Sequence, residues 1–286
     1  MVQDNFFNPK QTINCRGKII NLSSPVVMGI INLTPDSFYD GDKYKSNWDI
    51  IKQAEKLLHE GATILDLGAA STRPGAKIIS SEEETKRLLP AMEAILKNFP
   101  SAFISVDTYN SATAVNAIEN GAHIINDISA GNFDPNMFET IAQYNVPYIM
   151  MHIKGTPENM QKNPVYIDLV EEIAIYFKDK TEKLRQAGVK DIIIDPGFGF
   201  GKTVEHNYEL LNKLEYFKIF ELPIMVGLSR KSMINKVLDI SPNEALNGTT
   251  ALNTIALQKG ANILRVHDVK QAVETIKLIK KYREVL

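Results

Sequence analysis

Cysteine is almost absent from this chain of 286 residues, which carries only Cys15. A single cysteine excludes an intrachain disulfide, so the fold does not depend on a disulfide framework. No apolar stretch approaches the roughly 20 residues of a membrane helix. The opening stretch, MVQDNFFNPKQTINC, lacks the basic start and apolar core of a signal peptide. We therefore expect a cytoplasmic protein that does not enter a membrane.

An excess of charge of either sign is also missing. The formal net charge is −2 and the basic residues form no block, so we expect no nucleic-acid partner. An anionic substrate would have to be bound by a few placed basic side chains or by a metal ion. The hydrophobic content of 44% and charged content of 23% are ordinary for a globular protein with a large core.

The glycine-rich turn of dinucleotide-binding folds, GxGxxG, does not follow the first apolar run. Its absence disfavours an open, doubly wound sheet, which is the main alternative to a barrel for this chain. The later stretch GFGFGK, residues 197–202, resembles a phosphate-binding loop but lacks the GxxxxGK[ST] spacing. We therefore expect no P-loop.

Short apolar runs alternate with longer amphipathic segments along most of the chain. This alternation predicts parallel strands linked by helices. The predicted strands are residues 26–32, 63–68, 103–107, 124–127, 148–151, 192–195, 224–227 and 263–266. The predicted helices are residues 48–60, a segment from 81 onward, 111–120, 136–144, 166–187, 205–214, 243–259 with a shorter piece before it, and 269–282.

Eight such units without a linker predict an α/β fold, a closed (β/α)8 TIM barrel that forms one domain over residues 1–286. Residues 12–22 alternate around Arg16-Gly17-Lys18 and predict a short N-terminal hairpin that plugs one end of the barrel.

Polar side chains stand at or just after the C-terminal end of every predicted strand. They are Asn32; Ser71, Thr72 and Arg73; Asp107; Asn126 and Asp127; His152; Asp195; Ser229, Arg230, Lys231 and Ser232; and Arg265 and His267. One such residue could simply cap the next helix, as Asp107 and Asp127 could each do. Because barrel enzymes keep their active sites at this end, the full set predicts a catalytic pocket.

One group at this end suits an anion. Arg265 and His267 are two residues apart, so both face the same side of the last strand, which neighbours the first strand and its Asn32. Two basic groups and an amide oxygen suit a phosphate or pyrophosphate, with Mg²⁺ on the amide oxygen and the phosphate oxygens. The alternative is a structural salt bridge from Arg265 to a carboxylate, which we consider less favoured at the open end of an apolar strand.

A second group suits a flat heterocycle with several donors and acceptors. It consists of Asp107, Asn126, Asp195 and Lys231. A carboxylate forms paired hydrogen bonds with an N–H and a neighbouring NH₂ group. Burying these groups without a partner would be costly, so a ligand is implied. A structural Asp–Lys pair is the alternative, but it leaves the second aspartate unexplained.

Several motifs resemble those of the dihydropteroate synthase family. They are NLTPDSFYDGD, STRPGA, SVDTYN, IINDIS, DPGFGFGK, GLSRKSM and RVHD, in this order from Val26 to the end. The resemblance implies a TIM-barrel transferase of folate biosynthesis. Such an enzyme joins 6-hydroxymethyl-7,8-dihydropterin pyrophosphate to p-aminobenzoate and releases pyrophosphate through an SN1-like pterin cation. One departure is Ala69-Ala70-Ser71, where many relatives have GGES or GGQS.

The resemblance also implies roles for individual residues. Those that would bind the pterin are Asp107, Asn126, Asp195 and Lys231. Those that would bind pyrophosphate are Asn32, Arg265 and His267, with the cofactor Mg²⁺ on Asn32. Those that would bind p-aminobenzoate, and sulfonamides in its place, are Phe38, Thr72, Pro74, Phe200, Lys231 and Ser232. The residues expected to act in catalysis are Asp107, Lys231, Arg265 and His267.

The family resemblance also implies a homodimer, for which Leu252, Ile255 and Leu257 are candidate contacts. Two rival functions remain at this point. A pterin-binding methyltransferase barrel would use a similar Asp/Asn/Asp set but has no use for STRPG and SRKS. A non-catalytic homologue would bind pterin without turnover.

Overall fold

The computed structural model describes residues 10–34, 47–71 and 79–285. Eight strands in these residues make up the main sheet. They are β3 (Val26–Asn32), β4 (Ile64–Gly68), β5 (Phe103–Asp107), β6 (Ile124–Asp127), β7 (Tyr148–Met151), β8 (Ile192–Asp195), β9 (Met225–Val226) and β10 (Ile263–Val266). Their order in the sheet is β8-β7-β6-β5-β4-β3-β10-β9, with parallel pairing throughout.

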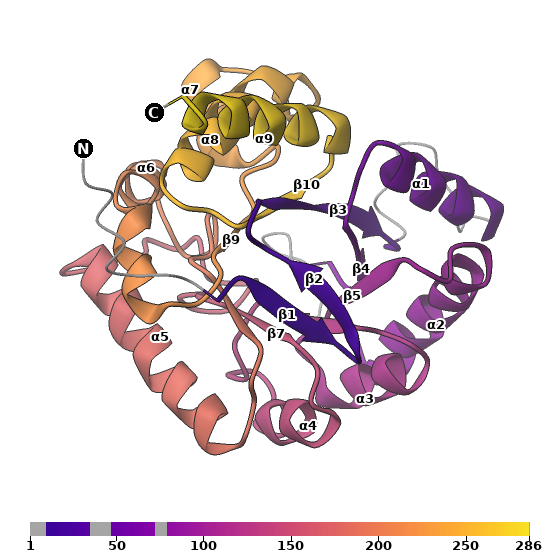
Figure 1. The fold of residues 1–286 in the computed structure, drawn as a ribbon. Coiled ribbons are helices and arrows are strands. Elements are labelled where there is room, and N and C mark those ends of the chain that lie inside the picture. The colour runs from indigo at the N-terminus through magenta and orange to yellow at the C-terminus, as the bar shows by residue number, and fades with distance from the viewer. Residues whose placement is uncertain (1–9, 35–46, 72–78, 286) are drawn as a thin grey trace.

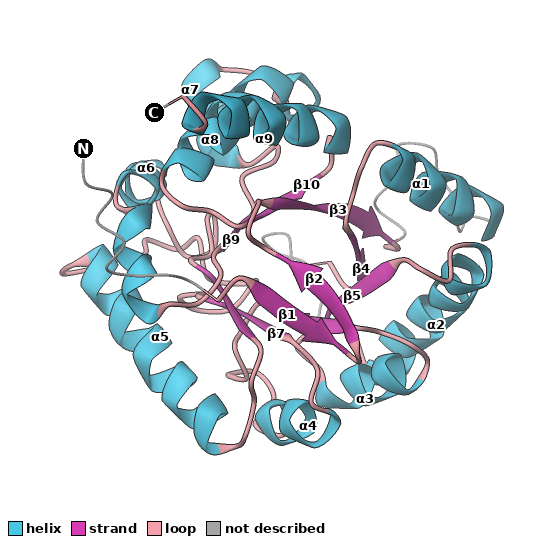
Figure 2. Ribbon diagram, in the orientation of Figure 1, coloured by secondary structure: helices cyan, strands magenta, loops and turns pink. Residues whose placement is uncertain are grey.

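The sheet closes into a barrel because a parallel bridge between Ile194 and Ile224 joins β8 to the segment that enters β9. Helices surround the strands on the outside (Figures 1 and 2). They are α1 (Asn47–His59), α2 (Ser81–Asn98), α3 (Ser111–Glu119), α4 (Met137–Tyr144), α5 (Leu169–Gln186), α6 (Val204–Asn212), α7 (Ser232–Leu238), α8 (Leu246–Gln258) and α9 (Val269–Arg283). The predicted (β/α)8 barrel is confirmed.

The helices differ from the prediction at several boundaries and in one additional element. Helix α5 begins at Leu169 rather than near 166, because the Asp168 carboxylate caps it by accepting from the Val170 and Glu171 N–H groups at 3.0 and 2.9 Å. After α6 the chain forms a 3-10 helix, η2 (Leu214–Phe220), which was not predicted. Its buried Leu214 and Phe217 lie three residues apart, which matches the three residues per turn of a 3-10 helix.

The N-terminal hairpin closes one end of the barrel. Strands β1 (Thr12–Cys15) and β2 (Lys18–Asn21) pair in antiparallel fashion and lie across the end nearest the viewer in Figure 1. Their buried Ile13, Cys15 and Ile20 pack against the apolar side chains inside that end. The Arg16 guanidinium donates to the Ile118 carbonyl at 2.7 Å and so ties the hairpin to α3. The predicted hairpin is confirmed.

The inner face of the barrel wall changes from apolar to polar along the strands, whereas the outer face is mainly apolar. Alternate strand residues face outward and pack against the helices, as Leu65, Ile104 and Ile125 do. The inward residues at the N-terminal ends of the strands are also apolar; they include Met28, Ile64, Ile124, Ile149, Ile193, Met225 and Ile263. Further along the strands the inward positions become polar, beginning with Asp66, Ser105 and Asn126. This change places the polar site at the C-terminal mouth.

Asp127 faces outward and belongs to the fold rather than to the mouth. Its carboxylate accepts from the Ser129 N–H and hydroxyl, the Gly131 N–H and the Tyr148 hydroxyl, at 2.6–2.8 Å. We expect Asp127→Ala to lower the free energy of unfolding by about 2–4 kcal/mol, because it leaves several buried donors without an acceptor. Urea unfolding would measure this, with Asp179→Ala on the exposed face of α5 as the control. An equal effect in both variants would contradict the assignment.

The helical side chains suggested for a dimer interface divide into two kinds. Leu252 and Leu257 are 8% and 0% exposed and pack in the core, so their prediction as contacts with a second chain is wrong. Helix α8 turns this face toward the barrel wall, which a single sequence does not reveal. Ile255 is 38% exposed and can reach a partner.

In the part of the chain that the structure describes, no helix combines the length and the apolarity needed to cross a bilayer.

Candidate active site at the barrel mouth

The predicted heterocycle group converges at the mouth of the barrel. Asp107 and Asn126 are direct neighbours in the register of β5 and β6. Asp195 ends β8, where it is only 4% exposed. Lys231 follows β9, and its ammonium would lie 3.7 Å from a Cβ atom added at Gly227. Four residues from distant parts of the sequence therefore share one end of the barrel.

Arg265 lies at the centre of this site and holds two carboxylates. Its Nε is 2.6 Å from Asp66 Oδ2, and its Nη2 is 2.6 Å from Asp107 Oδ2. The salt bridge from Arg265 to a carboxylate, which the sequence analysis considered the less favoured alternative, is therefore present. Arg265 faces inward from β10, and β10 and β4 flank β3, so a long guanidinium side chain reaches across the narrow interior to both aspartates.

Asp66 was missed by the sequence analysis, although a signal was present. It is a lone acidic residue in the apolar strand ILDLG, at an inward position, and is 0% exposed. The Oδ2 atom of Asp66 accepts from Arg265 and also from Asn126 Nδ2 at 3.2 Å. Asp66 thus connects the heterocycle group to the anion group, which the sequence had suggested were separate. Its Oδ1 is buried and has no hydrogen-bond donor among the described residues, as expected where a ligand or water donates.

Burial and charge shift the ionisation of these groups. Burial raises the pKa of Asp107 to about 7, opposed by Arg265 and reinforced by the negative charge of Asp66. Burial alone would lower the pKa of Arg265, but the Asp66 and Asp107 carboxylates raise it above its ordinary value. Arg265 therefore remains a cation between two carboxylates.

Asp195 and Lys231 form the other charged part of the mouth. Burial raises the pKa of Asp195, and Lys231 opposes this shift. Burial lowers the pKa of Lys231 to about 8, opposed by Asp195. The Lys231 ammonium donates to the Phe198 carbonyl and lies 4.8 Å from the centroid of the Phe200 ring. Asp195 Oδ1 accepts from the Gly197 N–H at 2.8 Å, which leaves acceptor capacity for a ligand.

The predicted anion group lies where the loops after β9 and β10 meet the end of β3. His267 Nδ1 is 3.0 Å from the Ser229 hydroxyl, which also accepts from the His267 N–H at 3.2 Å. Arg230 binds the Asp268 carboxylate through Nε and Nη2 at 3.2 and 2.7 Å. These contacts hold the β9 loop against the β10 loop, with Asn32 at the end of neighbouring β3.

The chemistry of Asn32 fits the predicted Mg²⁺ ion. Mg²⁺ commonly keeps several waters and uses one or two protein oxygens together with substrate phosphates. A single amide oxygen at the end of β3, the strand that pairs with the Arg265-bearing β10, matches that pattern better than a metal site made wholly of protein ligands. In residues 10–34, 47–71 and 79–285 no cluster of three His, Cys, Asp or Glu residues could hold a metal ion.

The predicted p-aminobenzoate residues are placed in part. Phe38, Thr72 and Pro74 lie outside the described residues. Phe200 packs against an apolar cluster at the mouth that includes Ile128, Met151 and Met160. Ser232 begins α7 directly after Lys231. Of the predicted residues that the structure describes, Phe200 therefore lies next to the ammonium of Lys231.

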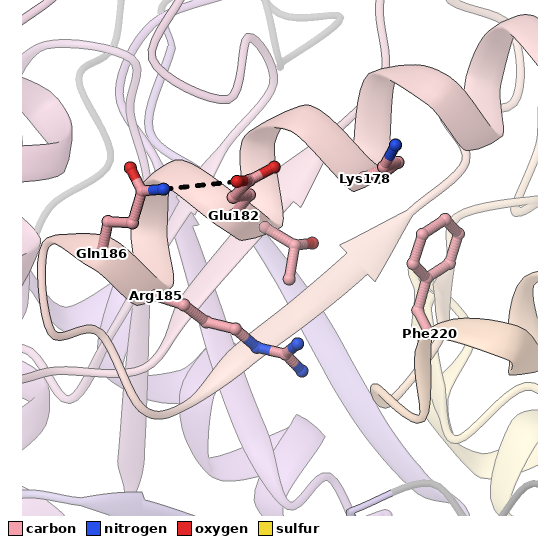
Figure 3. Close-up of a pocket in the computed structure, with 6 residues that line it drawn as sticks. Lys178, Glu182, Arg185, Gln186 and Phe220 are labelled. Carbon is pink, nitrogen blue, oxygen red and sulfur yellow. Dashed lines mark hydrogen bonds between the residues drawn. The ribbon is translucent and has the colours of Figure 1, made fainter.

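A groove of about 450 Å³ lies elsewhere, on the outer surface between α5 and η2 (Figure 3). Its lining residues are Lys178, Thr181, Glu182, Arg185, Gln186 and Phe220. Because α5 runs back antiparallel to the strands, its last turns lie at the end opposite the mouth. The groove includes none of the predicted site residues.

Comparisons with known proteins identify the family to which the chain is similar. Residues 28–267 match the family described as pterin binding enzyme. The dihydropteroate synthase of Escherichia coli (strain K12) is 45% identical over 267 residues, which are 93% of this chain and 94% of that protein. The Haemophilus influenzae enzyme of the same name is 43% identical, over 91% of this chain and 95% of that one.

Solved structures give the same result. The dihydropteroate synthase of Yersinia pestis in complex with a sulfonamide drug superposes with a TM-score of 0.91 at 41% identity, covering 96% of this chain and 99% of that one. The Xanthomonas albilineans dihydropteroate synthase with 4-aminobenzoic acid superposes at 0.89 with 34% identity, covering 96% and 98%. The match extends over nearly the whole chain and includes the barrel that carries the polar mouth. This chain belongs to the dihydropteroate synthase family of pterin binding enzymes.

Proposed function

We propose that this protein condenses 6-hydroxymethyl-7,8-dihydropterin pyrophosphate with p-aminobenzoate to give 7,8-dihydropteroate and pyrophosphate, within a single barrel domain. The observation that carries the proposal is the buried polar network at the mouth. There Asp66 and Asp107 bind Arg265, and Asn126 donates to Asp66; Asp195 and Lys231 are further charged residues of the same mouth. Such a set of buried donors and acceptors suits a polar heterocycle.

In the proposed reaction the C–O bond to pyrophosphate breaks first and leaves a pterin methylene cation. Asp195 accepts hydrogen bonds from the N–H groups of the pterin, and Asn126 and Lys231 bind its remaining polar edge. The Asp107 carboxylate stabilises the developing positive charge. The aniline nitrogen of p-aminobenzoate then attacks the methylene carbon. This amine is neutral at pH 7, so the step needs little help from a general base.

The anion group acts on the departing pyrophosphate. Arg265 and His267 supply hydrogen bonds and positive charge to its oxygens, and Asn32 would hold Mg²⁺ through its amide oxygen. When bound there, Mg²⁺ supplies charge that stabilises the leaving group. Arg265 contributes to both halves of the site, because it also holds Asp107 and Asp66.

The direct test is an assay of the purified protein with both substrates and Mg²⁺. We expect stoichiometric formation of dihydropteroate and pyrophosphate, and inhibition by a sulfonamide that competes with p-aminobenzoate. A protein that binds the pterin but forms no product would instead be the non-catalytic homologue. Methyl transfer from a methyl-pterin would favour the methyltransferase alternative.

Asn32→Ala tests whether Asn32 contributes to binding through Mg²⁺ and pyrophosphate rather than through the pterin ring. We expect this variant to weaken binding of the pterin pyrophosphate in the presence of Mg²⁺ by roughly tenfold, about 1.4 kcal/mol, because one metal ligand is lost. Binding of the pterin without phosphate should stay within about twofold of the wild type, since Asn32 is not in the heterocycle group. Calorimetry with both ligands measures the difference. Equal losses for the two ligands would contradict the assignment of Asn32.

We also propose that the pocket for p-aminobenzoate forms fully only when pyrophosphate is bound. Ordering the loops of the mouth costs conformational entropy, which a bound anion can offset. We expect Mg²⁺-pyrophosphate to raise the affinity for p-aminobenzoate at least roughly tenfold, with the same factor in the reverse titration. Calorimetric titration of p-aminobenzoate with and without Mg²⁺-pyrophosphate checks this. Identical affinities would mean that the pocket is preformed.

A homodimer and a cytoplasmic location complete the proposal. Exposed apolar side chains on α7, α8 and α9 support a dimer; they are Val237, Leu238, Leu246, Ile255, Leu278 and Tyr282. Sedimentation velocity would distinguish a dimer from a monomer.

A further inference from the structure

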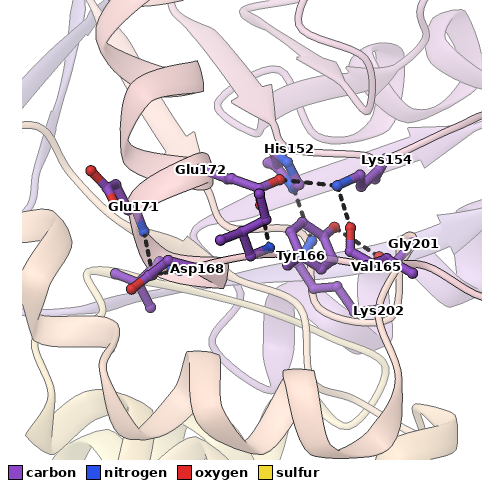
Figure 4. Close-up of polar contacts among 11 residues, drawn as sticks. His152, Lys154, Val165, Tyr166, Asp168, Glu171, Glu172, Gly201 and Lys202 are labelled. Atoms are coloured by element: carbon purple, nitrogen blue, oxygen red, sulfur yellow. Dashed lines mark hydrogen bonds and ion pairs between the residues drawn. The ribbon is translucent and has the colours of Figure 1, made fainter.

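Lys202 is a buried lysine that the proposed reaction does not use. It ends the loop between β8 and α6 and is 3% exposed. Its ammonium donates to the Gly197 carbonyl at 2.9 Å and the Phe200 carbonyl at 3.1 Å. It also lies 3.0 Å from His152 Nδ1 (Figure 4). Burial lowers the pKa of Lys202, opposed by the negative charge of Asp195. The ammonium form has three donors, and these three contacts occupy all of them. Lys202 therefore binds protein rather than substrate.

His152 is able to accept this hydrogen bond. It follows β7, is 6% exposed, and packs edge-on against Tyr176 with ring centroids 5.0 Å apart. Burial and the positive charges of Lys202 and Lys154 hold the pKa of His152 well below its ordinary value. The ring is therefore neutral, and Nδ1 accepts when the proton is on Nε2. The Lys202–His152 contact joins the loop after β7 to the loop after β8.

The backbones of these two loops also touch directly. Gly197 has φ +74°, and a Cβ atom there would lie 1.9 Å from the His152 carbonyl oxygen. At Gly201, with φ +63°, a Cβ atom would lie 2.4 Å from the Lys154 carbonyl oxygen. Glycine is needed at both positions because of the positive φ and because no side chain fits.

Further contacts hold the β8–α6 loop in the same position. The Tyr166 hydroxyl donates to the Gly201 carbonyl at 2.8 Å (Figure 4). Gln161 Nε2 donates to the Gly199 carbonyl at 2.6 Å, and the Gly199 N–H donates to Asn207 Oδ1 at 2.6 Å. The loop is thus enclosed between the β7–α5 loop and helix α6, with the Lys202 ammonium in its centre.

The closed loop presents two groups to the mouth. The Phe198 carbonyl accepts the Lys231 ammonium, and the Phe200 ring lies 4.8 Å from that ammonium. Phe200 and Lys231 are both predicted to line the p-aminobenzoate pocket. Since Lys202 binds the Phe200 carbonyl itself, loss of its ammonium should release the backbone that carries this ring.

We propose that Lys202, held by His152, is a positioning residue for the p-aminobenzoate side of the site. By binding the Gly197 and Phe200 carbonyls it sets where Phe200 and Lys231 stand, although it touches neither substrate. The proposal rests on the proposed function and adds to it the residues that shape one substrate pocket.

The test compares Lys202→Met, which keeps the length of the side chain but removes the ammonium, with the wild-type enzyme. We expect the KM for p-aminobenzoate to rise at least roughly tenfold, equivalent to about 1.4 kcal/mol, and more than the KM for the pterin pyrophosphate. A purely structural role would lower the melting temperature and the active fraction without a change in KM. An unchanged KM for p-aminobenzoate in folded protein would overturn the proposal.

A double-mutant cycle with Phe200→Ala asks whether Lys202 acts through the ring. If it does, adding Lys202→Met to Phe200→Ala should raise the KM for p-aminobenzoate by no more than about twofold, because the ring that Lys202 positions is already gone. If the double variant instead raises the KM for p-aminobenzoate by the product of the two single-variant factors, this mechanism is overturned. Lys213→Met is the matched control; this exposed lysine binds Glu209 on α6 at 2.8 Å and should leave both KM values unchanged.

His152→Phe covers the case in which Lys202→Met does not fold. It keeps the ring packed against Tyr176 and leaves Lys202 its two carbonyl acceptors. We expect a rise of about threefold or more in the KM for p-aminobenzoate, since one of three hydrogen bonds is lost. A wild-type KM in this variant would overturn the proposal. Absence of dihydropteroate formation by the wild-type protein would instead overturn the proposed function.

Discussion

Asp195→Asn is expected to weaken pterin binding by roughly 100-fold, about 2.8 kcal/mol. The substitution keeps an amide oxygen that can accept from the Gly197 N–H, as Asp195 Oδ1 does at 2.8 Å. It replaces the other carboxylate oxygen with an NH₂ group, which faces the N–H donors of the pterin and cannot pair with them. The site then loses a charged hydrogen bond, and the new NH₂ group and the pterin N–H group face each other as two donors without an acceptor.

Calorimetry with a pterin that lacks the pyrophosphate measures this effect free of the anion group. Asp179→Asn, on the exposed surface of α5, is the control and should bind normally. The melting temperature of Asp195→Asn should stay close to that of the wild type, because its local hydrogen bond is retained. Unchanged pterin affinity would show that Asp195 does not contact the heterocycle.

Arg265→Met is expected to have the largest effect on both stability and binding. It removes the cation from between Asp66 and Asp107, which lie 2.6 Å from its Nε and Nη2 atoms. Removing one partner of a buried ion pair costs about 3–5 kcal/mol, because the remaining charge is left without compensation. Pyrophosphate binding should fall as well, and pterin binding with it, because Asp107 loses the residue that holds it.

The stability loss in Arg265→Met should depend on pH in a defined direction. In the wild type the pKa of Asp107 is raised from 3.8 to about 7, so the folded protein binds a proton more tightly than the unfolded chain. This group therefore favours folding below pH 4, and its contribution declines as the pH rises through 7. Without Arg265, which opposes the rise, the pKa of Asp107 should increase further.

We therefore expect the difference in unfolding free energy between wild type and Arg265→Met to be larger at pH 8 than at pH 5. Urea titrations at the two pH values measure it. Arg185→Met, an exposed change on α5, should show no such dependence. A difference that is the same at both pH values would mean that the two carboxylates are not left unpaired in the variant.

Much of this protein follows from local sequence patterns. The alternation of short apolar runs with amphipathic segments was sufficient for the eight-stranded barrel, because strands and helices each bury a periodic face. Side chains alternate between the two faces of a strand, and Asp107, Asn126 and Asp195 each stand at a strand's C-terminal end. These two features indicated that they meet at the mouth. These features are local, so a single sequence carries them.

The contacts within the mouth depended on the closure of the barrel. Arg265 and Asp66 are 199 residues apart in the chain, yet their side chains meet at 2.6 Å. No local pattern encodes that distance; it follows from the sheet order β4-β3-β10 and the narrow interior. For the same reason the sequence suggested two separate groups of site residues, whereas the structure joins them through Asp66 and through the direct ion pair between Arg265 and Asp107.

Side-chain burial on helices and in loops was likewise decided by the tertiary structure. Leu252, Ile255 and Leu257 are all apolar, but only packing against the barrel determines that the first and third are buried while Ile255 is exposed. Lys202 is similar, since a charged residue at the end of a glycine-rich loop would be expected in solvent. It is buried because the Gly197 and Phe200 carbonyls and His152 converge on its ammonium, and that convergence exists only once the loops after β7 and β8 have packed together.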